Sequence, residues 1–107
     1  MMKLYTKSRD GVLYNATAIF EDGIVTVCKG SKINRKNAEG FKPKKAVAAL
    51  REDSSKFDEG DILNTDVSFS NLSTAATFVT GRTANGMIVW KTEDGKYVRY
   101  TLQKKEA

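Results

Sequence analysis

Histidine is absent from the 107 residues of this chain, and this absence excludes more chemistry than any other feature of the composition. Without histidine the chain cannot build the Ser–His or Cys–His pairs that activate catalytic nucleophiles, and it lacks the usual general base near neutral pH. One cysteine and no histidine also exclude a structural zinc site of Cys and His ligands. We therefore predict a protein that is not an enzyme and that has no cofactor.

Cysteine and long apolar runs are scarce as well. Cys28 is alone, so it cannot form an internal disulfide, and we expect it to be a small buried hydrophobic residue in a reducing compartment. No run approaches the roughly 20 apolar residues of a membrane helix. The first six residues lack the apolar core of a signal peptide. These absences predict a cytoplasmic protein with no membrane partner.

The composition that remains is typical of a globular protein, with 40% hydrophobic and 29% charged residues. Its length predicts a single domain over residues 1–107, and we expect the lysine-rich segment 103–107 to be a flexible basic tail.

Alternating apolar residues predict a β-hairpin in the first third of the chain. In segment 12–20, every second residue from Tyr14 to Phe20 is apolar, which places that set on the core side of a strand. Glu21-Asp22-Gly23 then forms a turn with Asp-Gly at its tip, and residues 24–28 return as the partner strand. Residues 3–7 predict a further short strand.

Two helices and a second hairpin are expected in the remainder. Pro43 suits the first position of a helix over residues 43–57, whose basic residues Lys44, Lys45 and Arg51 would point away from its apolar side. Asn71 is an N-cap candidate for a second helix, which Gly81 would end. Residues 87–92 and 97–102 would form strands around the turn at residues 93–95. The predicted class is α+β, with two β-hairpins in an antiparallel sheet packed against two short helices.

Charge is distributed unevenly, although the total of +5 is modest. Segment 29–51 carries eight basic residues and one acidic residue, whereas segment 52–66 carries six acidic residues and one basic residue. Phosphate contacts need mobile cations and backbone N–H groups, and Gly30-Ser31 with the neighbouring basic side chains would supply both. The competing interpretation of this basic segment is an ordinary solvated surface.

Arg82 and Asn85 follow the second predicted helix in a loop of small polar residues. Arginine and asparagine read guanine and adenine edges in the major groove. Asn85 has a second interpretation, as a turn residue with positive φ before Gly86, and Trp90 is expected in the core rather than as a stacking platform. The candidate nucleic-acid-binding residues are Lys29, Ser31, Lys32, Arg35, Lys36, Lys44, Lys45, Arg82 and Asn85.

Three segments resemble an uncharacterised family, the domain-of-unknown-function family 4357. Segment 27–32 (Val-Cys-Lys-Gly-Ser-Lys) resembles the family's strand ending in Gly-Ser, and segment 69–76 (Phe-Ser-Asn-Leu-Ser-Thr-Ala-Ala) resembles its helix start. Segment 81–86 (Gly-Arg-Thr-Ala-Asn-Gly), followed by Trp90-Lys91 and Gly95, is similar to the family's ending. The resemblance spans roughly residues 12–102. The chain departs from it at Asn71 and Leu72, where the family often has serine and proline.

The resemblance implies a nucleic-acid context, because family members are commonly appended to GIY-YIG-type nucleases or occur among restriction–modification proteins. A related restriction-associated domain has been proposed to read modified DNA. The Tyr, Arg and Glu pattern of the GIY-YIG nuclease itself is missing here, and the family has no established catalytic residues that could be carried over.

Three function hypotheses follow. The first is a small non-catalytic accessory module that binds nucleic acid, DNA rather than RNA, with modified DNA as one candidate ligand. The second is an adaptor domain that pairs its charged segments with a nuclease or methyltransferase subunit, or with itself. The third is a metal-dependent nuclease that uses the acidic segment 52–66. The oligomeric state stays open.

Overall fold

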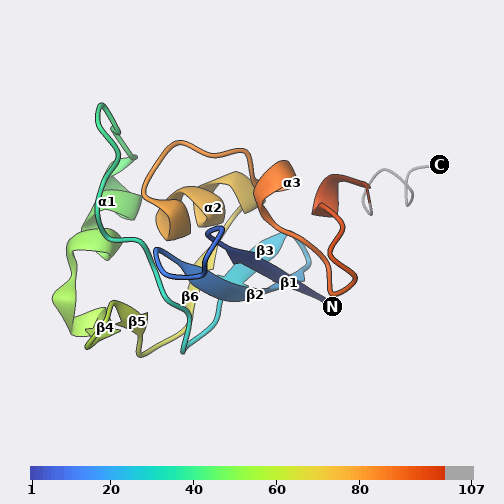
Figure 1. The fold of residues 1–107 in the computed structure, drawn as a ribbon, viewed down its shortest axis with the longest axis horizontal. Helices are drawn as coiled ribbons and strands as arrows, with labels where there is room; N and C mark the ends of the chain where they lie inside the picture. The colour runs from blue at the N-terminus through green and yellow to red at the C-terminus, as the bar shows by residue number, and fades with distance from the viewer. Residues whose placement is uncertain (101–107) are drawn as a thin grey trace.

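A four-stranded antiparallel sheet forms one layer of the domain (Figure 1). The structure is a computed structural model that describes residues 1–100, and the predicted tail at residues 103–107 lies outside this range. The predicted α+β class is confirmed. In spatial order the strands are β1 (Met2–Lys7), β2 (Asn15–Glu21), β3 (Ile24–Val27) and β6 (Val67–Phe69).

The register of the sheet explains the alternation in the sequence. Leu4 of β1 is opposite Ala18 of β2, which is opposite Val27 of β3, and all three side chains are fully buried. The predicted hairpin between β2 and β3 is confirmed, since Glu21 pairs with Ile24 across a two-residue turn. Cys28 follows β3 and is only half-buried, not fully buried as predicted.

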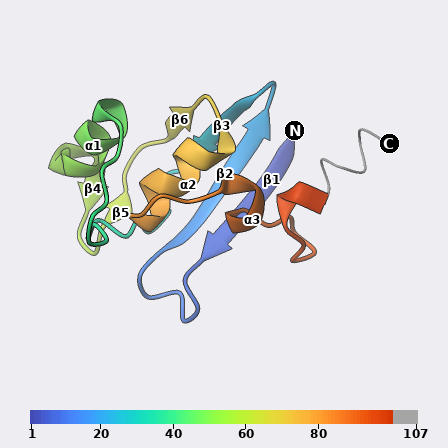
Figure 2. The same ribbon diagram turned by 90° about the horizontal axis from the view of Figure 1, so that it is seen from above.

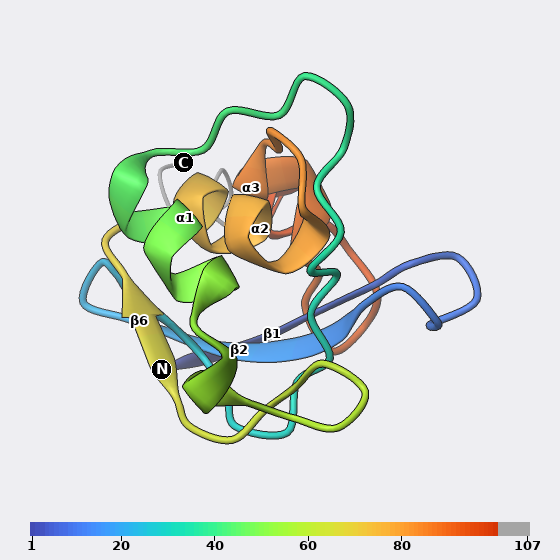
Figure 3. The same ribbon diagram turned by 90° about the vertical axis from the view of Figure 1, so that its left-hand side faces the viewer.

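The helices lie together on one face of the sheet (Figure 3). The core lies between them and the strands, where the Phe78 ring of α2 is 5.1 Å from the Phe69 ring of β6, centroid to centroid. A two-stranded ribbon lies at one end of the domain (Figure 1). No helix among residues 1–100 is long and apolar enough to cross a membrane. The bounds are α1 Lys45–Glu52, 3₁₀ helix Ser54–Lys56, β4 Phe57–Asp58, β5 Ile62–Leu63, α2 Leu72–Thr80 and α3 Gly86–Val89.

Both predicted ends of α2 are confirmed. The side-chain oxygen of Asn71 accepts the backbone N–H of Thr74 at 2.7 Å, which satisfies a free donor of the first turn. Gly81 ends the helix with φ of 78°, in the left-handed region that favours glycine. Helix α2 is therefore positioned by signals that lie within its own sequence.

The prediction for the first helix was wrong at both ends. Helix α1 begins at Lys45, two residues after Pro43, and it ends at Glu52, while Phe57 belongs to strand β4. Arg51 was expected to point away from the apolar side, but it is buried. The reason is that its guanidinium finds backbone carbonyl partners in the interior, which no pattern within α1 could indicate.

The second predicted hairpin is also wrong. Residues 86–89 form the short helix α3, because the Asn85 side chain accepts the N–H of Met87 at 3.0 Å and caps a helical turn. The apolar run at residues 87–90 is typical of a strand, but this capping and the burial of Trp90 override that preference. Residues 98–100 are helical as well, and residues 101–102 lie outside the described residues. What remains of the hairpin is the turn at 93–95, closed by a bridge between Lys91 and Tyr97.

Candidate nucleic-acid interface

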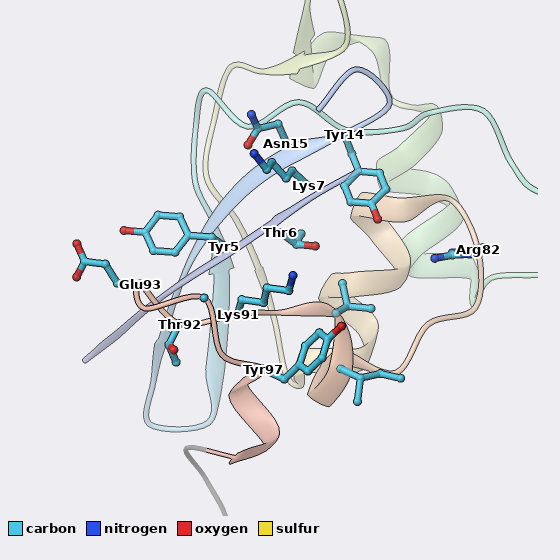
Figure 4. Close-up of a pocket in the computed structure, with 13 residues that line it drawn as sticks. Tyr5, Thr6, Lys7, Tyr14, Asn15, Arg82, Lys91, Thr92, Glu93 and Tyr97 are labelled. Carbon is cyan, nitrogen blue, oxygen red and sulfur yellow. The ribbon is translucent and has the colours of Figure 1, made fainter. Parts of the chain in front are cut away.

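Two adjoining hollows lie beside the loop that joins β1 to β2. The first has a volume of about 530 Å³ and lies between the strands β1 and β2, helix α3 and segment 91–97 (Figure 4). The second, of about 580 Å³, lies between the β1–β2 loop, segment 34–39 and the end of α2. Tyr14 and Arg82 line both hollows, which we together name the basic groove. Its cations are Lys7, Arg9, Lys36, Arg82 and Lys91, and its carboxylates are Glu39 and Glu93.

The β1–β2 loop extends beyond the rest of the domain (Figure 2) and carries Arg9 and Tyr14. Its shape is held by Ser8, whose hydroxyl oxygen accepts the N–H groups of Leu13 at 3.1 Å and Tyr14 at 3.3 Å. The Asp10 carboxylate accepts the N–H of Val12 at 2.9 Å, and this hydrogen bond lowers the pKa of Asp10. The loop thus presents Arg9 and Tyr14 from an organised backbone.

Segment 34–38 carries Lys36 and is fastened to the carboxyl end of α2. The backbone N–H of Asn34 donates to the Val79 carbonyl at 2.9 Å, and its side-chain amide donates to the Thr80 carbonyl at 3.0 Å. The N–H of Ala38 donates to the Gly81 carbonyl at 2.9 Å. These bonds use carbonyls that the helix end leaves free, and they bring Lys36 next to Arg82.

Arg51 completes this attachment from the side of α1. Its guanidinium donates to the Phe78 carbonyl at 2.6 Å, the Asn34 carbonyl at 2.8 Å and the Asn37 side-chain oxygen at 2.7 Å. Burial lowers the pKa of Arg51, and nearby Arg35 lowers it further. Arg51 therefore faces the interior, and it supports the groove without lining it.

Segment 91–97 supplies the remaining wall. Lys91 and Tyr5 exchange two backbone hydrogen bonds of 2.8 Å, which join this segment to the edge of β1. The Lys91 amino group lies 5.2 Å from the centroid of the Tyr97 ring. In Figure 4 the Lys91 amino group and the Arg82 guanidinium point into the first hollow, with Tyr14 and Tyr97 on its other two sides.

The cations of the basic groove are not neutralised by nearby carboxylates. None of the five forms an ion pair within 4.0 Å with an acidic side chain of residues 1–100. Lys7, Arg9, Lys36, Arg82 and Lys91 are also exposed to solvent. Their charges are therefore available to an anion from outside. The ion pairs found in residues 1–100 are Arg35–Asp61, Lys56–Asp53 and Lys96–Asp94.

Lys29, Ser31 and Lys32 of the predicted site surround a third hollow of about 440 Å³, which adjoins the first through Asn15. The expectation that backbone N–H groups here would contact phosphate was wrong. The N–H groups of residues 29–32 are all used internally, and Ser31 is buried. Only the two lysine side chains remain for a ligand. The four backbone N–H groups, taken from residue 29 to residue 32, donate to the Asp66 carboxylate and to the carbonyls of Leu63, Cys28 and Asn15.

Arg35 is engaged within the fold. Its guanidinium lies 4.2 Å from the centroid of the Phe57 ring and 3.6 Å from the Asp61 carboxylate, and its Nε donates to the Arg51 carbonyl at 3.0 Å. These contacts join Arg35 to the ribbon β4–β5 and to the end of α1. The arrangement gives Arg35 a structural role in place of the predicted contact with a ligand.

Lys44, Lys45 and Asn85 lie apart from the basic groove. Lys44 and Lys45 are exposed at the start of α1, and Lys44 lines a different hollow of about 350 Å³. Asn85 caps α3 with φ of −90°, so its predicted role as a turn residue with positive φ was wrong. Of the nine predicted residues, the structure thus brings only Lys36 and Arg82 together in the groove.

Lys7, Arg9 and Lys91 are groove residues that were not predicted from the sequence. Lys7 and Arg9 flank Ser8 in a segment of mixed composition and Lys91 stands alone, so no long run of charge indicated them. Lys91 alone carried a signal, since it follows Trp90 in the segment that carries the family resemblance. Their convergence depends on the pairing of β1 with β2 and with Lys91.

The acidic segment 52–66 does not gather into one site. Asp53 accepts both the hydroxyl and the N–H of Ser55, and the hydroxyl hydrogen bond is the main cause of its lowered pKa. Asp66 accepts the N–H of Lys29 at 2.7 Å, while Asp61 pairs with Arg35. Within residues 1–100, no three acidic or cysteine side chains are close enough to hold a metal ion.

The comparison with protein families covers almost all of this structure. The family described as Domain of unknown function (DUF4357) matches residues 4–101, which include every cation of the basic groove. The chain belongs to this family. The predicted membership of the DUF4357 family is thereby confirmed. Neither a curated protein nor a solved structure matches the chain.

In this DUF4357 domain the segments that carry the resemblance hold one another in place. The Ser73 hydroxyl accepts the N–H of Gly86 at 3.0 Å, and the indole N–H of Trp90 donates to the Leu72 carbonyl at 3.1 Å. The start of α2 is therefore the docking point of α3. Most cations of the basic groove lie outside these segments.

Proposed function

We propose that this DUF4357 domain binds nucleic acid along the basic groove and is not itself catalytic. The observation that carries the proposal is the convergence of five cations from four separate segments around two adjoining hollows. Phosphates are the groups that such a surface favours, because each contact releases condensed counterions. Tyrosine side chains interleaved with the cations add surfaces on which a base or sugar can pack.

The test is fluorescence anisotropy with labelled oligonucleotides at several salt concentrations. We expect binding that weakens steeply with salt, by a slope of about −0.9 per phosphate contact for duplex DNA and about −0.7 for a single strand. The double variant Lys36→Gln/Arg82→Gln should bind at least about tenfold more weakly, with a slope smaller by about two. Both side chains are exposed, so the change should leave the fold intact.

The matched control is Lys44→Gln/Lys45→Gln, which removes the same charge from an exposed surface outside the groove. It should retain nearly all of the affinity. If the two double variants lose affinity equally, binding follows net charge and the basic groove is not the site. An absence of binding at 50 mM salt in every arm would exclude the proposed function.

We further propose that the domain acts beside a nuclease or a methyltransferase in the cytoplasm. Its support is the resemblance to restriction-associated proteins and the single cysteine, which suits a reducing compartment. DNA is the nucleic acid expected in that setting. Base modification is a variable that the same anisotropy measurement can include.

A protein partner is the second candidate, and one observation favours it. Val12 and Leu13 are 59% and 57% exposed at the tip of the β1–β2 loop, the part that extends beyond the domain (Figure 2). Exposed apolar side chains on a protruding loop are typical of protein contacts. A complex that survives 1 M salt without nucleic acid, and that Leu13→Ser abolishes, would favour this function over the first.

A further inference from the structure

The first hollow of the basic groove differs from an ordinary phosphate-binding surface because aromatic and apolar side chains line it. Tyr14 and Tyr97 stand on opposite sides of the hollow in Figure 4. Tyr97 is 39% exposed and Ile88 is 45% exposed, with Val89 beside them. Exposed rings and aliphatic groups gain nothing from phosphate. They gain from a flat, weakly hydrated surface such as the face of a base.

Duplex DNA cannot offer that surface, since its base faces are covered by neighbouring base pairs. Building on the proposed function, we propose that the ligand of the basic groove is single-stranded nucleic acid, with one unpaired base held in the first hollow against Tyr97. The strand's phosphates would lie at the cations around the rim. This deepens the proposed function by naming the class of nucleic acid that the groove takes.

The dimensions and the arrangement of charge suit this ligand. A volume of about 530 Å³ lies within the range of roughly 300–1,000 Å³ typical of small-ligand pockets, so a base with its sugar can enter. The Lys91 amino group lies over the Tyr97 ring, 5.2 Å from its centroid, so a base that stacks on this face has to displace the flexible Lys91 side chain, whose cation then stays next to the strand. Arg82 points into the hollow from another side, whereas Glu93 points away from it (Figure 4).

Polar groups at the same hollow can contact the edge of the base. Thr6 lines it with 7% of its surface exposed, and Asn15 stands at its edge, where the first hollow adjoins the third. An amide side chain both donates and accepts hydrogen bonds, and a hydroxyl does the same, so neither restricts the hollow to one base. Stacking and flexible polar contacts of this kind are typical of single-strand sites with little sequence preference.

The experiment compares a fluorescein-labelled 12-nucleotide DNA strand of mixed sequence with the same strand annealed to its complement, at 50 mM salt. We expect the single strand to bind at least about tenfold more tightly than the duplex. Tyr97→Leu should weaken single-strand binding roughly 5- to 150-fold, the loss that removal of one base–aromatic stack produces. Its effect on duplex binding should be less than about twofold.

Two further variants make the test specific. Tyr97→Phe keeps the ring and should keep the affinity, which separates stacking from damage to the fold. Tyr100→Leu changes an exposed tyrosine three residues further along, outside the hollow, and should leave single-strand binding unchanged. Equal or tighter binding of the duplex, or wild-type affinity in Tyr97→Leu, would overturn the inference. If the glutamine variants of Lys36 and Arg82 still weaken binding in that case, the proposed function survives without it.

Discussion

Arg51→Met should lower the free energy of unfolding by about 3–5 kcal/mol, although Arg51 lies outside the basic groove. Its guanidinium donates to the carbonyls of Phe78 and Asn34 and to the Asn37 side chain, and only 3% of its surface is exposed. A hydrogen bond from a charged group contributes about 1.5–3 kcal/mol, and unsatisfied buried acceptors cost about 1–3 kcal/mol each. Part of this loss is offset because the variant no longer pays the free-energy cost of burying a cation.

Urea denaturation followed by circular dichroism measures the change. Arg99→Met is the control, since Arg99 is exposed, and it should change the unfolding free energy by less than about 0.5 kcal/mol. Arg51→Lys should be intermediate, because an ammonium group cannot reproduce the planar fork. A loss below 1 kcal/mol in Arg51→Met would mean that the carbonyls find other partners.

The same variant has a consequence for binding. Without the Arg51 guanidinium, segment 34–38 loses its hydrogen bonds at the Asn34 carbonyl and the Asn37 side chain, so Lys36 should be held less firmly beside Arg82. We therefore expect weaker binding of the 12-nucleotide strand even at temperatures where the variant is folded. Binding equal to the wild type under those conditions would show that the position of segment 34–38 is unimportant for the ligand.

Gly86→Ala should lower the free energy of unfolding by about 3 kcal/mol or more, because the added Cβ atom collides with backbone atoms and not because of a strained backbone angle. A Cβ atom at Gly86 would lie 2.2 Å from the Leu72 carbonyl carbon and 2.5 Å from the Ser73 nitrogen. Both are backbone atoms of α2, so no side-chain rotation can relieve the contact, and α3 has to move away. That movement would break the hydrogen bond from Trp90 to the Leu72 carbonyl.

The fluorescence of Trp90 reports this event directly, because it is the single tryptophan of the chain and is fully buried. We expect its emission to shift to longer wavelength in Gly86→Ala, together with a lower urea midpoint. Gly95→Ala is the matched control. A Cβ there meets nothing within 4 Å, so only its φ of +82° is unfavourable, at about 1 kcal/mol. Similar losses in the two variants would argue against a tight contact between α2 and α3.

These two sites explain why the family resemblance indicates the fold more strongly than the function. Gly81 ends α2, Asn85 caps α3, and Gly86 with Trp90 fits against the start of α2. Each of these residues is required by backbone geometry or packing. The cations proposed to bind phosphate tolerate more variation in position, and three of them, Lys7, Arg9 and Lys36, lie outside the segments that resemble the family.

The sequence by itself determined what depends on neighbours within a few residues. The alternation of β2, the Asp-Gly turn before β3 and both ends of α2 follow from side-chain period and capping, and all of them were predictable. The strand predicted at residues 87–92 was wrong because Asn85 capping and the burial of Trp90 outweighed the preference of Ile and Val for strands.

Only the tertiary structure decided which cations face a ligand and which support the interior. Arg51 and Arg35 look like their exposed neighbours in the sequence, yet one holds the end of α2 and the other pairs with Asp61. Lys7 and Lys91 line the same hollow because Tyr5 of β1 pairs with Lys91, a contact between residues far apart in the chain. Such convergence depends on sheet register and helix docking, whose energies come from many distant contacts at once, so no local pattern encodes it.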